Sequence, residues 1–200
     1  MPEAPVLMVG TDQAVVEADL LGGRLSCPSC AGVLGAWGYA RTRVLRRRSG
    51  REDRRRPRRG RCRSCKKTHV LLGEDALVRR RDEVAVIGEA IEAKAAGVGH
   101  RRIADRLDVP GWRVRRWLRR FRDRAVEITE AFARWAFALD GSLAPNGPGR
   151  GVFADALEAV AVAARAAVLR HGPRPPWCFA SFASGGMLVA NTRCPLPSAP

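Results

Sequence analysis

The chain carries a short cysteine motif twice, first as Leu25-Ser26-Cys27-Pro28-Ser29-Cys30 and again as Arg61-Cys62-Arg63-Ser64-Cys65-Lys66. In each copy two residues separate the thiols, so both sulfurs can face one tetrahedral ion while backbone N–H groups of the turn support the thiolates. Two such pairs supply four ligands, which is the complete set of a structural zinc site. We therefore expect one structural Zn²⁺ bound by Cys27, Cys30, Cys62 and Cys65.

The segments beside these cysteines favour a zinc ribbon, a small β structure built around its metal. Ala14–Leu20 and Val33–Tyr39 flank the first pair with strand-like composition, and Thr68–Leu72 follows the second. Gly32 and Gly60 stand where we expect the turns to need open backbone angles.

An arginine-rich stretch lies between the two cysteine pairs. The gap is 31 residues, longer than the roughly 15–20 of common zinc sites, and the excess is Arg46–Arg59. We interpret this stretch as a solvated loop that touches phosphates. Because residues 20–75 hold few large apolar side chains, the metal would supply folding energy. The expected phosphate contacts are Arg54, Arg55, Arg56, Arg58 and Arg59.

Other interpretations of the cysteines fit less well. A thioredoxin-like pair requires a strand–helix junction in an α/β unit, and iron–sulfur proteins show other spacings. We expect His69 to be a surface histidine of a strand rather than a ligand. Fifteen residues separate Cys178 from Cys194 in a region of different composition, and we expect both to behave as small hydrophobes.

The net charge of the 200-residue chain is +16, and two segments account for it. Residues 41–67 hold thirteen arginines and two lysines against two acids, and residues 111–124 hold seven arginines against one acid. Arginine enrichment is also typical of GC-rich bacterial genomes, but that bias does not explain the clustering. The clusters predict a polyanionic partner, and a hydrophobic fraction of 46 % is enough for a folded core.

Helical periodicity begins at residue 82. Apolar Val84, Ile87, Ile91 and Ala95 form one stripe, which ends at glycines 97 and 99. His100–Phe121 then matches a helix-turn-helix. In this pattern the residues that face inward are Ile103, Leu107, Val114 and Trp117, and Val109 anchors the turn. Asp108 occupies the turn position where glycine is commonest. Aspartate can take this position because it tolerates left-handed backbone angles.

The second helix of this motif would present arginines outward. A recognition helix contacts bases through its N-terminal residues, so Trp112, Arg115 and Arg116 are the candidates for reading bases, with packing an open alternative for Trp112. Arginines farther along the helix are expected to contact phosphates. The complete set expected on the DNA side of this helix is Trp112, Arg113, Arg115, Arg116, Arg119, Arg120 and Arg122.

A heptad stripe continues through residues 114–139, which predicts one long helix from near Trp112 to Leu139. A proline- and glycine-rich loop follows, and then a second helix that starts near Phe153. The stripe suits either an antiparallel hairpin with that second helix or a homodimer seam. The tail from His171 suits either packing on the helices or docking a partner.

The expected fold class is therefore α+β, with a small N-terminal β zinc ribbon, an all-α helix-turn-helix and a C-terminal helical hairpin. The predicted domains are residues 12–75, 82–124, 125–171 and a tail at 172–200. No uncharged apolar stretch has the length of a membrane span, and the N-terminus lacks the features of a signal peptide. We expect a cytoplasmic, nucleoid-associated protein without a membrane partner.

The residues quoted above also carry a resemblance. Cys27–Cys30, Arg59–Cys65, Thr68–Leu72 and Ile103–Phe121 together resemble bacterial mobile-element proteins that join a zinc ribbon to a helix-turn-helix, including uncharacterised proteins encoded near transposase genes in GC-rich bacteria. The resemblance covers about residues 20–125, and it implies that both modules act on DNA.

These observations predict a sequence-specific binder of double-stranded DNA, either a transposition accessory factor or a transcriptional regulator. An RNA-binding or ribosome-associated protein, and an interaction module for RNA polymerase or a transposase, are the alternatives. We do not expect an enzyme, because the roughly 75 residues after the helix-turn-helix are too short and too helical for a ribonuclease-H-like metal site with three carboxylates.

Overall fold

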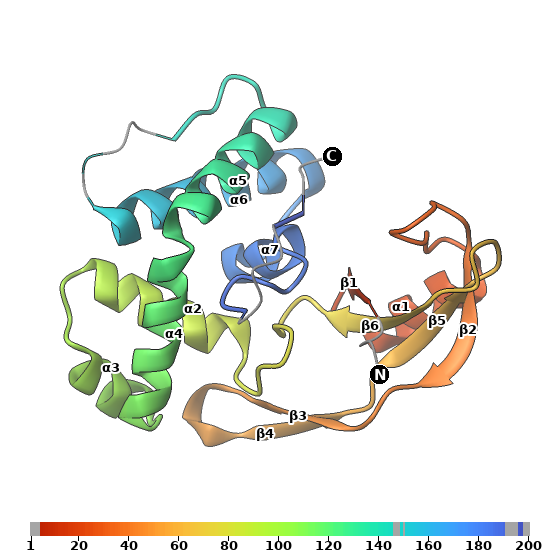
Figure 1. The fold of residues 1–200 in the computed structure, drawn as a ribbon, viewed down its shortest axis with the longest axis horizontal. Coiled ribbons are helices and arrows are strands. Elements are labelled where there is room, and N and C mark those ends of the chain that lie inside the picture. The colour runs from red at the N-terminus through yellow and green to blue at the C-terminus, as the bar shows by residue number, and fades with distance from the viewer. Residues whose placement is uncertain (1–4, 146–148, 150, 191–195, 198–200) are drawn as a thin grey trace.

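The computed structural model describes residues 5–145, 149, 151–190, 196 and 197, and it has a small β structure beside a larger helical body (Figure 1). The expected α+β class is confirmed, because the described residues form an N-terminal sheet and seven α-helices. The strands are β1 (Val6–Val9), β2 (Leu34–Tyr39), β3 (Arg43–Arg46), β4 (Glu52–Arg55), β5 (Arg58–Cys62) and β6 (Thr68–Gly73). The helices are α1 (Gln13–Leu21), α2 (Val84–Ala95), α3 (His100–Leu107), α4 (Gly111–Asp123), α5 (Ala125–Leu139), α6 (Val152–His171) and α7 (Pro176–Ala183).

The main sheet has the strand order β1-β6-β5-β2, with β1 parallel to β6 and the other pairs antiparallel. Helix α1 covers one face, where Leu20, Leu34 and Leu71 form a small core. We expected a strand at residues 14–20, and this was wrong. The carboxylate of Asp12 accepts hydrogen bonds from the N–H groups of Ala14 and Val15, which starts a helix at that point.

The arginine-rich stretch is ordered, so the expected solvated loop at Arg46–Arg59 was also wrong. Strands β3 and β4 form an antiparallel hairpin that extends from the sheet toward α3 and α4 (Figure 1). Leu45 of this hairpin is buried with Met8 and Leu72 on the sheet face opposite α1. The hairpin therefore covers part of the sheet and links it to the helical body.

Ion pairs explain how such a basic segment folds. Arg47 lies 2.6 Å from the carboxylate of Glu83 and 3.1 Å from that of Asp53. Arg55 lies 2.8 Å from Asp53 and 2.7 Å from Asp75, whose side chain is buried. Asp53 lies within the hairpin, and Asp75 and Glu83 follow β6. These acids neutralise the arginines that face the helical body, so the hairpin can pack there with few unpaired charges.

The expected single helix from Trp112 to Leu139 is two helices. Arg124 has φ −117° and ψ 6°, which ends α4 and begins α5. Its guanidinium donates hydrogen bonds to the carboxylate of Glu127 and to the carbonyl of Met187 in the C-terminal segment. The change of direction between α4 and α5 is therefore stabilised by two contacts of Arg124, one with α5 and one with the C-terminal segment.

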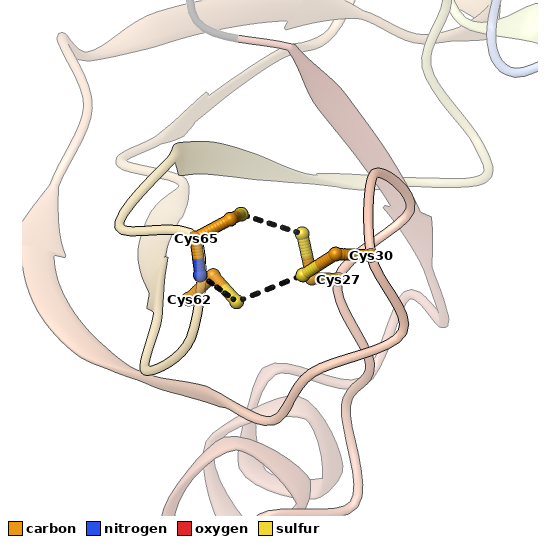
Figure 2. Close-up of side chains that lie close together, drawn as sticks. All are labelled: Cys27, Cys30, Cys62 and Cys65. Atoms are coloured by element: carbon orange, nitrogen blue, oxygen red, sulfur yellow. Dashed lines mark hydrogen bonds between the residues drawn. The ribbon is translucent and has the colours of Figure 1, made fainter.

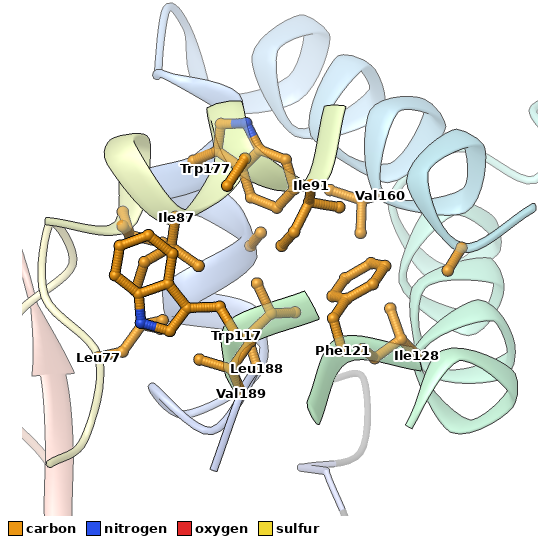
Figure 3. Close-up of a cluster of buried hydrophobic side chains, with 14 of the residues drawn as sticks. Leu77, Ile87, Ile91, Trp117, Phe121, Ile128, Val160, Trp177, Leu188 and Val189 are labelled. Carbon is orange, nitrogen blue, oxygen red and sulfur yellow. The ribbon is translucent and has the colours of Figure 1, made fainter. Parts of the chain in front are cut away.

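Helices α5 and α6 pack as a hairpin, and α2, α4 and α7 complete the core around them (Figures 1 and 3). The stripe predicted at 114–139 is mostly buried inside this one chain, including Val114, Phe121, Ile128 and Phe132. The antiparallel hairpin is confirmed, and the homodimer seam, which can coexist with it, stays a prediction.

The described part of the tail packs on the helices. Trp177 of α7 lies against Gly88 of α2, where a Cβ atom would come within 2.2 Å of the indole ring. The indole Nε1 donates a hydrogen bond to Glu92 at 2.7 Å, and Leu188 and Val189 are buried in the same core (Figure 3). A glycine at this position of α2 is therefore required for the close approach of α7.

Candidate metal centre and basic surface

The four cysteines expected to bind metal lie together. The Sγ atoms of Cys27, Cys30, Cys62 and Cys65 are all within 4.8 Å of one another, with 3.7 Å between Cys27 and Cys65 and 3.5 Å between Cys30 and Cys62 (Figure 2). Four sulfurs placed tetrahedrally at about 2.3 Å from an ion would be about 3.8 Å apart. The spacing of the thiols therefore fits a structural metal site.

Backbone N–H groups support two of these sulfurs, those of Cys27 and Cys62, as thiolates. The N–H of Ser29 donates to Cys27 Sγ, and the N–H of Cys65 donates to Cys62 Sγ, both at 3.4 Å. Burial raises the pKa of Cys62, but the backbone hydrogen bonds of Cys65 and Ser64 outweigh burial and lower that pKa to about 6. The pKa of Cys27 is lowered in the same way: burial raises it, and the N–H of Ser29 leads the opposing interactions. A thiolate is the form that binds metal.

The backbone angles of the two turns differ from expectation. Ala31 and Lys66, each one residue beyond a cysteine pair, have positive φ values of 57° and 62°, whereas Gly32 and Gly60 do not. Gly32 is needed for space instead, because a Cβ atom there would lie 2.6 Å from Ser64 Oγ and 3.1 Å from Cys62 Sγ. The two turns thus approach each other across a position without a side chain.

His69 was expected on the surface, and this was wrong. Its side chain is fully buried, and Nε2 lies 3.2 Å from Cys27 Sγ. Burial, followed by the charge of Lys67, lowers the pKa of His69 and favours the neutral imidazole. A neutral ring with its proton on Nε2 can donate a hydrogen bond to the thiolate of Cys27. His69 would therefore support a metal-binding cysteine rather than bind the metal itself.

Among the described residues, the four cysteines are the only group of three or more potential metal ligands. Cys178 is partly buried on α7, and burial raises its pKa to about 11, in keeping with the expected role as a small hydrophobe. Cys194 lies outside the described residues.

Helices α3 and α4 meet at a tight turn. Asp108 adopts the left-handed conformation, with φ 50° and ψ 50°, as its place in the sequence predicts. A Cβ atom on Gly111 would lie 3.9 Å from that of Ala104, so the helices cross closely. The residues expected to face inward, Ile103, Leu107, Val114 and Trp117, are all buried.

The opposite side of α4 is an exposed basic stripe. Trp112 is 62 % exposed, and Arg115, Arg116, Arg119 and Arg122 are exposed along the full length of the helix. The packing alternative for Trp112 therefore does not describe this structure. These residues recur at helical spacing, whereas Val114, Trp117, Leu118 and Phe121 fill the buried side.

Two arginines expected on this surface, Arg113 and Arg120, are partly buried instead. Arg113 donates a hydrogen bond at 3.1 Å to the buried carboxylate of Asp82. Arg120 is half-buried, one of its terminal nitrogens has no hydrogen-bond partner, and burial lowers its pKa. Both side chains are therefore poorly placed to contact a partner.

The arginines expected in the loop also divide into two groups. Arg54 and Arg56 are exposed on β4 and just beyond it. Arg55 is paired with Asp53 and Asp75, and Arg58 donates to Glu17 of α1 at 2.9 Å. Arg59 is half-buried, and its Nε atom lacks a hydrogen-bond partner. Only Arg54 and Arg56 of these five remain well exposed.

The structure joins the two basic segments, which the sequence separates by more than forty residues. The carbonyl of Arg46 at the end of β3 accepts from the N–H of Glu83, next to the Asp82 that binds Arg113 of α4. At the hairpin tip, a Cβ atom on Gly50 would lie 4.0 Å from a carboxylate oxygen of Asp108. The tip of the hairpin and the turn before α4 therefore lie side by side.

In the part of the chain that the structure describes, every helix is too short or too polar to cross a membrane. Comparison of the chain with protein-family models, with curated proteins and with solved structures finds no match.

Proposed function

We propose that the protein binds double-stranded DNA, with α3 and α4 acting as a helix-turn-helix and α4 as the helix that enters the major groove. The observation that carries this proposal is the exposed stripe of Trp112, Arg115, Arg116 and Arg119, backed by a fully packed opposite side. Arginine can bind guanine O6 and N7 through two hydrogen bonds, so Arg115 and Arg116, near the start of α4, are the base-reading residues.

The β3–β4 hairpin would position the helix on the duplex. Arg54 is exposed on β4 and Arg56 just beyond it, and contacts from such residues to phosphates fix orientation without specifying sequence. Because the hairpin is fixed to the body through Arg47 and Arg55, these contacts would hold α4 at one angle to the groove.

We propose Zn²⁺ as the metal of the four-cysteine site, in a zinc-ribbon arrangement. Four thiolates at tetrahedral spacing are the donor set that structural zinc prefers. The ion would hold together the start of β2 and the end of β5, where Leu34 pairs with Cys62. It has no place in base recognition, and no reaction is assigned to it.

The biological role that fits this activity best is a transposition accessory factor or a transcriptional regulator of the nucleoid. The decisive experiment is selection of bound sequences from a random duplex pool, with zinc measured on the same protein sample. We expect a defined sequence motif, about one equivalent of zinc and steep weakening of binding with salt. A pool that stays random after selection at moderate salt would contradict sequence-specific binding.

A further inference from the structure

A second surface, on the sheet rather than on the helices, has the chemistry of a site for unpaired nucleobases. Trp37 of the edge strand β2 is 52 % exposed, and the guanidinium carbon of Arg61 lies 4.4 Å from the centre of its ring. Exposed aromatic rings beside arginine side chains are a common arrangement where proteins bind single nucleic acid strands.

This surface faces away from the metal. Gly60 and Cys62 of β5 point toward α1, since a Cβ on Gly60 would contact Leu20 and Leu34 and Cys62 is buried in the metal site. Side chains alternate along a strand, so Arg61 extends from the opposite face. Trp37 lies under Arg61 and therefore shares that face.

The charges on this face are not neutralised within the described protein. No carboxylate of the described residues lies within ion-pair distance of Arg61, or of Arg63, which is exposed beside Gly35 of β2. By contrast, Arg47, Arg55 and Arg58 are each paired with an acid. The carbonyl of Lys66 accepts from Arg61 Nε, which holds the guanidinium in place while its other donors stay available.

Tyr39, two residues farther along β2, provides an internal contrast. It is 50 % exposed and lies under two guanidinium groups, Arg58 at 4.5 Å and Arg56 at 5.1 Å, and Arg58 is bound to Glu17. Arg61 above Trp37 has no such carboxylate partner among the described residues.

We propose that Trp37 stacks on a base of an unpaired nucleic acid strand, while Arg61 and Arg63 bind the phosphates of that strand. A half-exposed indole can accept a second planar group, and the arginines supply the complementary charge. The site is separate from α4, so it does not rest on the proposed duplex binding. It would let the protein contact a melted or looped strand next to a duplex.

The test measures fluorescence anisotropy of labelled 12-mers on the full-length, zinc-loaded protein. The probes are a thymidine strand, a uridine strand, an abasic strand of equal charge and a hairpin duplex. We expect Trp37→Ala to weaken binding of the thymidine or uridine strand about 5-fold or more, with most affinity kept in Trp37→Phe. Duplex and abasic-strand affinities should change by less than about 2-fold, and the sugar of the tighter strand identifies DNA or RNA as the ligand.

Two further variants keep the result interpretable. Phe137→Ala removes an exposed ring from α5, outside both proposed surfaces, and should leave strand binding unchanged. Arg61→Ala leaves the indole in place and should lower the salt dependence of strand binding by about 0.7 in log–log slope, as loss of one phosphate contact does. Zinc content, measured for each variant, reports that the sheet is intact.

The proposal is overturned if Trp37→Ala binds the thymidine and uridine strands as tightly as the parent protein, or if the parent binds the abasic strand as tightly as both. Failure of the duplex function has a different signature. In that case the parent protein would not bind duplex above the abasic strand, while the loss caused by Trp37→Ala would persist.

Discussion

The carboxylate of Asp82 accepts a hydrogen bond at 3.1 Å from Arg113, and this contact ties the segment before α2 to the first turn of α4. The same segment pairs with the end of β3 through an isolated bridge between Arg46 and Asp82. One buried acid therefore links the two basic parts of the chain and sets where α4 begins relative to the hairpin.

Replacing Asp82 by alanine should lower the free energy of unfolding by about 1.5–3 kcal/mol, because Arg113 loses a charged hydrogen-bond partner in a largely buried place. The measurement is urea unfolding followed by the helical circular dichroism signal. Arg116→Ala, at an exposed position on the same helix, is the matched control and should unfold at the parent midpoint. Equal midpoints for Asp82→Ala and the parent would mean that the pair does not stabilise this junction.

Replacing Cys62 by serine should release the metal and unfold the N-terminal sheet, because three thiolates cannot close the site. The helices from α2 onward share a separate core and should keep most of their circular dichroism signal. Cys178→Ser, outside the cluster, should retain metal. Metal at full stoichiometry in Cys62→Ser, measured by elemental analysis, would count against the four-thiolate assignment.

Replacing Arg115 or Arg116 by alanine should relax the preference at one base pair by about 1–3 kcal/mol. Arg54→Ala should instead weaken all sequences alike and reduce the salt dependence by about 0.9 in log–log slope. Arg54 suits this comparison better than Arg55, which is bound to two acids. Competition binding with single-base variants of the selected site separates the two patterns, and identical uniform losses would show that α4 does not read bases.

Glu127 should make stability depend on acidity. Hydrogen bonds from Arg124, and then from the N–H of Leu196, hold the pKa of Glu127 below its usual value, against the opposing effect of burial. The pKa of Glu127 is lower in the folded state than in the unfolded state. Its carboxylate therefore contributes fully to the free energy of unfolding above the unfolded pKa of about 4.3, and this contribution is lost as pH falls through the folded pKa. Glu127→Gln should thus be less stable than the parent at pH 7, and the difference should shrink below about pH 4.

Urea unfolding of both proteins between pH 7 and pH 3 measures this difference. Glu130→Gln, exposed on the same helix, should match the parent throughout. A difference for Glu127→Gln that stays constant or grows on acidification would mean that the carboxylate charge is not what stabilises the contact.

The sequence alone predicts the features that depend on local spacing. The two cysteine pairs, the strand expected at Thr68–Leu72, the left-handed Asp108 and the buried side of α4 all follow from motifs within about twenty residues. Each is fixed by ligand geometry or by helical and strand periodicity, which a short window contains.

The features that sequence analysis missed depend on partners far along the chain. The β3–β4 hairpin has almost no apolar alternation, and it folds because Asp75 and Glu83 neutralise Arg47 and Arg55 from beyond β6. His69 resembles a surface residue until the fold brings Cys27 to its ring. Only the cap at Asp12 had a local signal, since aspartate is among the residues preferred at a helix N-cap.

Arg124 gives residues 172–190 a structural purpose that their proline- and glycine-rich composition does not suggest. Its bond to the carbonyl of Met187 fixes the corner between α4 and α5 from outside both helices. A chain shortened after His171 would lose that acceptor together with the buried Trp177 and Leu188. The C-terminal segment thus stabilises the angle between α4 and α5. The direction of the arginine-bearing helix α4 depends on residues that need not contact a ligand themselves.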